Sequence, residues 1–283
     1  MDLKSLQVLI NEGQVLYSPA QQSVIGIKGR DARDFLQRMS TNDMNMLGSE
    51  KPLITCFLNN KGRLIDVVIV FQKNHDDFLL ISSFEEPNKL ISWLESFHFV
   101  EEFSLEQQKG LFSTYALSLN QLKSPYAITL ASLPQSLSLK GQLSFLLSQK
   151  PLEESFCRSD FRMLAVCSLL PGVSEINESF MPQNVGLSHT ISETKGCYIG
   201  QEVIAKALTY QKNTKSLKAF TLSKEDYDRA SVGMKVEDLS KRVGIITSLA
   251  PYFLCSWPQG LAVMEDKSSL ESPKEYIKVQ LMV

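Results

Sequence analysis

Two apolar runs separated by a short polar turn constrain the fold of this chain more than any other feature. Residues 53–58, LITCFL, and residues 64–71, LIDVVIVF, flank a turn at 59–62, and a second turn at 74–77 leads to a third apolar run. Runs of this length, rich in β-branched residues and bounded by Asn and Gly, are typical of strands joined by turns. The stretch predicts a three-stranded antiparallel meander.

Hydrophobic periodicity predicts further elements. Residues 23–28 predict a strand, which Gly29 ends before a helix over 31–39, and the apolar stripe of residues 87–99 predicts another helix. Residues 201–210 carry apolar side chains at helical spacing and predict a helix that begins near Gly200.

The remaining segments give weaker patterns. Residues 113–120 predict a strand, whereas residues 117–150, rich in Leu and Ser and interrupted by proline, predict irregular loops and short helices. Residues 157–173 fit a helix or a strand. After residue 213, short strand-like runs separated by Gly, Pro and polar residues predict a small C-terminal β-barrel or sandwich.

Composition narrows the classes of function. With a formal net charge of −2 over 283 residues, the chain has no general attraction for nucleic acid, so we expect no direct nucleic-acid partner. No window approaches the roughly 18 apolar residues of a membrane span, and the N-terminus has no signal-peptide pattern. We therefore expect a cytoplasmic protein without a membrane partner.

The cysteines and histidines argue against disulfides and metal. The five cysteines are odd in number, never occur as C-x-x-C, and predict reduced thiols. The three histidines have no Cys or His at ligand spacing, so we expect no metal site. The sequence also lacks the G-x-S-x-G, P-loop and G-x-G-x-x-G motifs.

The stretch KGCYIGQE, residues 195–202, holds the most distinctive cysteine. Gly196 and Gly200 permit close approach of a ligand, while Lys195 and the start of the following helix favour a thiolate at Cys197. A small buried cysteine in a turn before a helix explains the same residues. Sequence physics leaves reactivity and packing both open.

Other charged residues have two interpretations each. Asp31 is best explained as a helix cap. Asp66 lies inside an apolar run, on the exposed face of an edge strand or buried facing a pocket. Arg63 and Arg162 can bind a carboxylate at the mouth of a cleft or lie on a solvated face. His189 is better explained as a turn residue than as a catalyst.

The stretch at 195–202 closely resembles the signature of the YgfZ family, the folate-binding relatives of the glycine-cleavage T-protein. Residues 29–43, 58–70 and 180–187 are similar to that family's strand–helix–TND, Lys-Gly-Arg and Pro-Gln segments, in the same order. The resemblance implies an α+β fold arranged as a three-lobed ring of antiparallel sheets and helices. It implies an α+β region of two intertwined subdomains at 1–210, a C-terminal β-barrel at 211–283, and tetrahydrofolate in the central opening.

The resemblance also implies roles for residues. Cys197 and Lys195 become the candidate catalytic residues, in a reactive-thiol loop at the rim of the folate cavity. The candidate cofactor-binding residues are Asn42, Asp43, Arg63, Asp66, Arg162, Tyr198, Gln201 and Glu202.

Three departures from the patterns of the YgfZ family and the related transferases bear on function. Only Asp66 is present where those enzymes have two adjacent acids, and Val67 takes the second place; Lys206 stands where the YgfZ family has arginine; and Arg162 lacks a Glu-Gly context. The loss of an acid disfavours aminomethyl transfer.

The resemblance therefore implies a folate-dependent accessory protein for iron–sulfur cluster assembly or maintenance, with iron–sulfur client or assembly proteins as partners and an indirect effect on tRNA modification. The alternatives are a tetrahydrofolate-dependent aminomethyltransferase and a folate-binding scaffold without chemistry.

Overall fold

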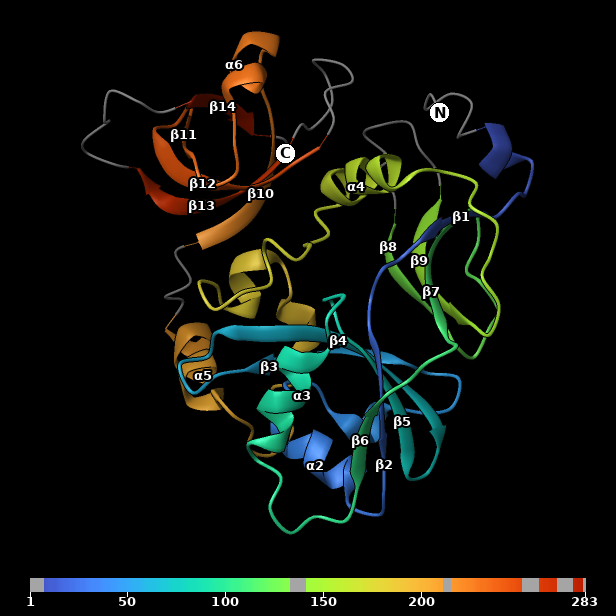
Figure 1. The fold of residues 1–283 in the computed structure, drawn as a ribbon. Coiled ribbons are helices and arrows are strands. Elements are labelled where there is room, and N and C mark those ends of the chain that lie inside the picture. The colour runs from blue at the N-terminus through green and yellow to red at the C-terminus, as the bar shows by residue number, and fades with distance from the viewer. Residues whose placement is uncertain (1–7, 133–140, 211–214, 251–259, 269–276, 282–283) are drawn as a thin grey trace.

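Three sheets form three lobes in the computed structural model of the chain (Figure 1). The structure describes residues 8–132, 141–210, 215–250, 260–268 and 277–281. A five-stranded sheet, a four-stranded sheet and a closed barrel surround a central region into which α4 and the loops after it project. The predicted α+β class is confirmed.

The predicted meander is the centre of the five-stranded sheet. The strand order is β3-β4-β5-β2-β6, and all pairs are antiparallel. Helices α2 and α3 bury their apolar stripes against one face of this sheet, where Phe35 and Phe57 are fully buried. The elements are β2 (Val24–Lys28), α2 (Ala32–Met39), β3 (Leu53–Leu58), β4 (Leu64–Asn74), β5 (Asp77–Ile81), α3 (Asn88–Glu95) and β6 (Ser104–Gln107).

The four-stranded sheet corrects one prediction. Residues 127–132 and 142–148, expected in loops and short helices, form strands, and residues 133–140 lie outside the described part. Leu and Ser have little intrinsic preference for strands, so these strands depend on pairing, with β9 hydrogen-bonded between β7 and β8. The strands are β1 (Leu16–Pro19), β7 (Phe112–Ser118), β8 (Ala127–Ser132) and β9 (Gln142–Ser148).

The C-terminal strands close into a barrel, as predicted. The order is β10-β13-β12-β11-β14, and β14 closes the barrel by pairing with β10. The β11–β14 pair is parallel and the others are antiparallel. The elements are β10 (Lys215–Thr221), α6 (Lys224–Arg229), β11 (Lys235–Asp238), β12 (Arg242–Leu249), β13 (Gly260–Ser268) and β14 (Ile277–Leu281). The domain division at residue 211 stays a prediction.

The segment between the sheets and the barrel contains two helices and short 3-10 turns. Residues 157–173 resolve as a helix, α4 (Arg158–Cys167), and α5 (Gln201–Thr209) begins directly after Gly200 as expected. The described part of the chain contains the 3-10 helices η1 (Met44–Met46), η3 (Pro182–Val185) and η4 (Ser188–Thr190).

The start of α5 packs on the turn between β3 and β4. Gly200 has φ +81°, a left-handed conformation that disfavours any side chain. A Cβ at this position would lie 2.7 Å from the carbonyl oxygen of Asn59 and 3.0 Å from Cα of Gly62. By contrast, a Cβ on Gly196 would meet nothing within 4 Å. The two glycines of the stretch 195–202 therefore have different structural requirements.

We expect Gly200→Ala to lower the free energy of unfolding by more than about 2 kcal/mol, because it combines left-handed strain with a clash against backbone. The matched control, Gly196→Ala, should change it by less than about 0.5 kcal/mol. Urea denaturation of both variants measures the difference, and equal midpoints would contradict the close packing of α5 on the turn.

Candidate functional site

A cavity of two connected chambers lies between the lobes. The apolar chamber has a volume of about 300 Å³ and lies between the two open sheets, the end of α4 and residues 186–189. The five-stranded sheet contributes Ile54, Val67, Ile69 and Ile81 to its wall. A small apolar cavity of this kind, with a few polar groups, is typical of a ligand site.

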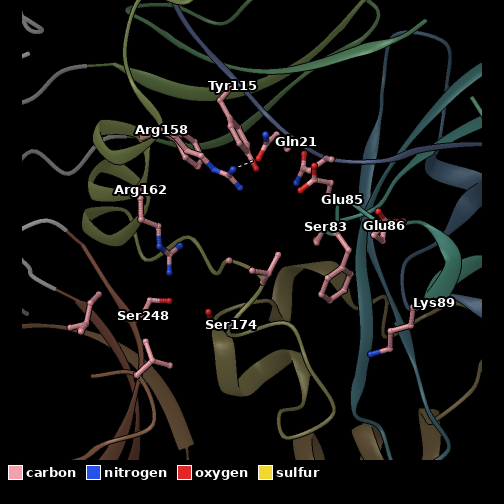
Figure 2. A pocket seen from close by; sticks show the side chains of 17 residues that line it. Gln21, Ser83, Glu85, Glu86, Lys89, Tyr115, Arg158, Arg162, Ser174 and Ser248 are labelled. Atoms are coloured by element: carbon pink, nitrogen blue, oxygen red, sulfur yellow. Dashed lines mark hydrogen bonds between the residues drawn. The ribbon is translucent and has the colours of Figure 1, made fainter. Parts of the chain in front are cut away.

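The polar chamber is larger, about 870 Å³, and shares Gln22, Ser83 and Tyr115 with the apolar chamber. Figure 2 shows Arg158 and Arg162 reaching into it from α4, with Lys89 on the opposite side. Its other charged lining residues are Glu85 and Glu86, and the barrel contributes Ser248 and Leu249. The polar chamber is therefore the charged entrance to the apolar one.

Helix geometry sets the two arginines side by side, because residues four apart lie on one face. Arg158 donates to the side-chain oxygen of Gln21, and Arg162 lies 3.5 Å from a carboxylate oxygen of Glu175. Glu175 is fully buried, and it also accepts hydrogen bonds from the backbone of Gly172 and the hydroxyl of Ser248. Arg162 thus lines the polar chamber, where it is paired with the buried Glu175.

Leu169, directly after α4, has a strained backbone. Its φ is +53°, whereas most residues at this C-terminal position of a helix are glycine. Its side chain is 44% exposed and lines the apolar chamber. Strained non-glycine residues concentrate at functional sites, so Leu169 marks this chamber as more than a packing defect.

The side chain of Lys195 is held in place by hydrogen bonds to the backbone. Its side-chain nitrogen donates to the carbonyl oxygens of Gln37 at 2.5 Å, Ser40 at 2.6 Å and Asn42 at 2.8 Å. Burial lowers the pKa of Lys195 to about 8, and the charge of Asp43 partly opposes that shift. The ammonium group therefore uses its three donors on the carbonyls at and after the end of α2. Among the described residues it has no hydrogen bond with Cys197.

Asn42 and Asp43 lie beside Lys195 at the end of α2, and we call these three residues the anchor. The Asn42 amide donates to the carbonyl of Ile54, and its oxygen accepts from the backbone of Asp43. The Asp43 carboxylate caps η1 and accepts from the side chain of Gln37. Neither residue lines the two chambers. They hold the end of α2 against β3.

Residues 198–202 face an outer groove, which we define by Asn59, Trp93, Phe97, Tyr198, Gln201 and Glu202. Burial raises the pKa of Tyr198 to about 12. The exposed Glu202 pairs with Lys206, which lowers the pKa of Glu202. Cys197 is exposed and lines neither chamber. The structure thus separates this stretch from the central cavity.

Asp66 takes the buried alternative, at 1% exposure, in the central part of the five-stranded sheet. One carboxylate oxygen accepts from the backbone of Val67 at 2.7 Å and of Ser83 at 3.1 Å, and the other from the hydroxyl of Ser82 at 2.5 Å. Burial raises the pKa of Asp66 to about 7, and these hydrogen bonds oppose the shift. Asp66 supports the chamber wall without lining it.

Two further residues differ in role from their simplest interpretation. Asp31 lies at the N-cap position of α2 but makes no side-chain cap; its carboxylate accepts from the backbone of Glu102. The Arg63 guanidinium donates to the carbonyl of Ser179 at 2.9 Å, outside both chambers.

The structure therefore does not bring the predicted site residues together. Of them, only Arg162 lines the central cavity; Lys195, Asn42 and Asp43 form the anchor, and Tyr198, Gln201 and Glu202 line the outer groove. The other three, Arg63, Asp66 and Cys197, lie in none of these places. Sequence reasoning missed Gln22, Tyr115, Arg158 and Ser168 and set His189 aside, although all five line a chamber. Of these five residues, only Arg158 had a signal in the sequence, namely its spacing of four residues from Arg162.

Within the described residues there is no group of three or more His, Cys, Asp or Glu side chains able to hold a metal ion. The four described cysteines are free, and Cys255 lies outside the described residues. None of the described helices has the length and apolar character needed to cross a membrane.

We expect Lys195→Met to lower the free energy of unfolding by about 3 kcal/mol, because it leaves three carbonyl oxygens without their donor. Cys197→Ser, at an exposed position two residues away, should change it by less than about 0.5 kcal/mol. Thermal and urea denaturation of both variants test this contrast. A Lys195 variant as stable as the wild type would show that these three hydrogen bonds do not stabilise the fold.

The raised pKa of Asp66 predicts a pH dependence of stability. Because the folded protein holds this proton more tightly than the unfolded chain, the contribution of Asp66 is fully present below about pH 4 and is lost as pH rises through about 7. Asp66→Asn keeps the shape but cannot ionise. The melting temperature of the wild type relative to this variant should therefore fall between pH 4.5 and 8. If the melting temperatures of the two proteins change in parallel with pH, the raised pKa of Asp66 is contradicted.

Comparisons with known proteins agree with this architecture. Residues 16–117 match the family model described as the GCVT N-terminal domain. A Haemophilus influenzae protein described as uncharacterized is 25% identical over 82% of this chain and 82% of its own length. An aminomethyltransferase of Bacillus pumilus is 35% identical over 28% of this chain, a match that spans only 22% of that enzyme.

A solved structure extends the likeness to most of the chain. The glycine cleavage system aminomethyltransferase T from Bartonella henselae superposes with a TM-score of 0.58, covering 89% of this chain and 79% of that chain at 12% identity. At this identity the likeness concerns the fold. Residues 16–117 are therefore similar to a GCVT N-terminal domain, and the chain adopts a fold like that of the glycine-cleavage aminomethyltransferases, as the resemblance implied.

Proposed function

We propose that this protein binds a reduced folate in the central cavity and serves iron–sulfur cluster assembly or maintenance as an accessory protein, with an indirect effect on tRNA modification. The observation that carries the folate assignment is the pair of joined chambers, one apolar and one lined by cations, in a fold shared with aminomethyltransferases. Reduced folates combine a flat ring system with a carboxylate tail, and each half matches one chamber.

The residues present fit tetrahydrofolate. The apolar chamber offers flat aliphatic walls, and two of its lining residues, Gln22 and Ser168, each carry a buried side-chain oxygen with no hydrogen-bond partner among the described residues. Arg158 and Arg162 would hold the tail carboxylates, since a guanidinium matches a carboxylate with two parallel hydrogen bonds. When bound, the folate would supply a carrier for one-carbon groups.

The iron–sulfur role rests on the YgfZ-like stretch 195–202 and on Val67. Val67 lines the apolar chamber where the resemblance expects the second acid of the transferases. Without that acid, the wall offers no carboxylate for proton transfer to a folate-linked amine. Cys197 is exposed on the surface, in the loop that precedes α5, and is available to a protein partner. These features favour the accessory role over the alternative aminomethyltransferase.

Calorimetric titration of the wild-type protein with tetrahydrofolate tests whether the folate binds. The same titration of Leu169→Gly tests whether it binds in the apolar chamber. Glycine relieves the left-handed strain, so this variant should melt no lower than the wild type while it loses part of the chamber wall and binds several-fold more weakly. No heat of binding to the wild-type protein would overturn the folate assignment. Unchanged affinity in the variant would place the ligand elsewhere.

Genetic complementation tests the cluster role. In cells that lack the protein, Cys197→Ser should fail to restore the activity of an iron–sulfur enzyme, although it folds normally because the position is exposed. Full rescue by this variant would exclude a mechanism centred on the thiol. Formation of methylenetetrahydrofolate from a lipoyl-bound aminomethyl donor would instead support the transferase.

A further inference from the structure

We infer that the apolar chamber selects an uncharged folate ring over a cationic one, with Gln22 and Ser168 as the residues that recognise it. Tetrahydrofolate and 5-formyltetrahydrofolate have uncharged rings, whereas 5,10-methenyltetrahydrofolate carries a positive charge on its ring. This inference rests on the proposed function, since it names which folates the same cavity accepts.

The wall of the apolar chamber carries no fixed charge. Its described lining residues include no Asp, Glu, Lys or Arg, and the only titratable side chains on it are Tyr115 and His189. Burial raises the pKa of Tyr115 to about 12, so this phenol is uncharged at neutral pH. A cation moved from water into such a chamber loses hydration and gains no counterion. A neutral ring of the same shape avoids that loss.

The buried carboxylate of Asp66 does not supply the missing counterion. Asp66 lies behind the wall formed by Val67 and Ser83, and both of its oxygens accept hydrogen bonds from protein groups. With a pKa raised to about 7, it is only partly ionised at neutral pH. Val67, on the other hand, lies on the wall itself, so the side chain at position 67 decides whether the ring meets a charge.

Gln22 is positioned so that its side-chain oxygen can accept a hydrogen bond from a ring N–H group. It lies in the loop between β1 and β2, and its backbone N–H donates to the carbonyl of Ala20 at 2.7 Å and contacts the hydroxyl of Ser113 at 3.2 Å. Its side-chain oxygen is buried without a partner in the described structure. A buried acceptor left unpaired costs about 1–3 kcal/mol, and a ligand N–H donor removes that cost.

Ser168 provides the second group. It ends α4, where its backbone N–H donates to the carbonyl of Leu164 at 3.0 Å, and its hydroxyl is buried with no partner among the described residues. A hydroxyl both donates and accepts, so Ser168 can pair with a ring carbonyl or with a ring N–H. Gln22 and Ser168 thus offer neutral hydrogen-bonding groups on a wall that is otherwise mostly aliphatic.

The test compares two ligands that share a tail. Isothermal titration of the full chain at pH 6 with 5-formyltetrahydrofolate and with 5,10-methenyltetrahydrofolate should give at least about tenfold tighter binding of the neutral folate. Equal affinities, or tighter binding of the cation, would overturn the selectivity and leave the folate assignment intact. Absence of binding by both ligands would overturn the proposed function itself.

Two substitutions locate the cause. Val67→Asp adds a carboxylate to the wall and should move the affinity ratio toward the cation by about tenfold, with Val67→Asn as the matched uncharged control. Gln22→Met keeps the length but removes the acceptor, and should weaken 5-formyltetrahydrofolate about tenfold while binding of the tail fragment p-aminobenzoylglutamate stays unchanged. If Gln22→Met binds the neutral folate as tightly as the wild type, Gln22 does not recognise the ring.

Discussion

The buried carboxylate of Glu175 ties the lobes of this molecule together. It accepts hydrogen bonds from Ser248 of the barrel and from the backbone of Gly172, and it lies 3.5 Å from Arg162 of α4. A fully buried carboxyl group is tolerated only with such partners, so the barrel, this loop and α4 meet at one point. That meeting holds Arg162 at the wall of the polar chamber.

Local pattern was sufficient for most of the secondary structure. The meander and the helix after Gly200 have strong signals of their own: β-branched runs, turn residues and helical spacing. The barrel strands have weaker signals, short strand-like runs separated by Gly, Pro and polar residues. The strands β8 and β9 have none, because Leu and Ser do not favour strands. Strand β9 forms by pairing with β7, a long-range contact that no single window contains, and β8 forms by pairing with β9.

The site was harder to predict for a related reason. The stretch 195–202 is conspicuous as a motif, yet Lys195 is engaged by the end of α2 and Cys197 faces outward. The chamber instead combines Gln22, Tyr115 and Ser168, which lie far apart in sequence and are ordinary residues in their own segments. Only the folded chain brings them to one wall, and the strain at Leu169 has no counterpart in the sequence pattern.

This separation constrains how thiol and ligand can be linked in the proposed function. Since Cys197 lines neither chamber, it is not in contact with a ring seated beside Val67. The physical connection between them is the protein itself: α5 packs through Gly200 on the turn that joins β3 to β4, and β4 carries Val67 to the chamber wall. The thiol and the chamber wall are thus linked through the β3–β4 turn and the start of α5, where Gly200 lies three residues after Cys197, and not by direct contact.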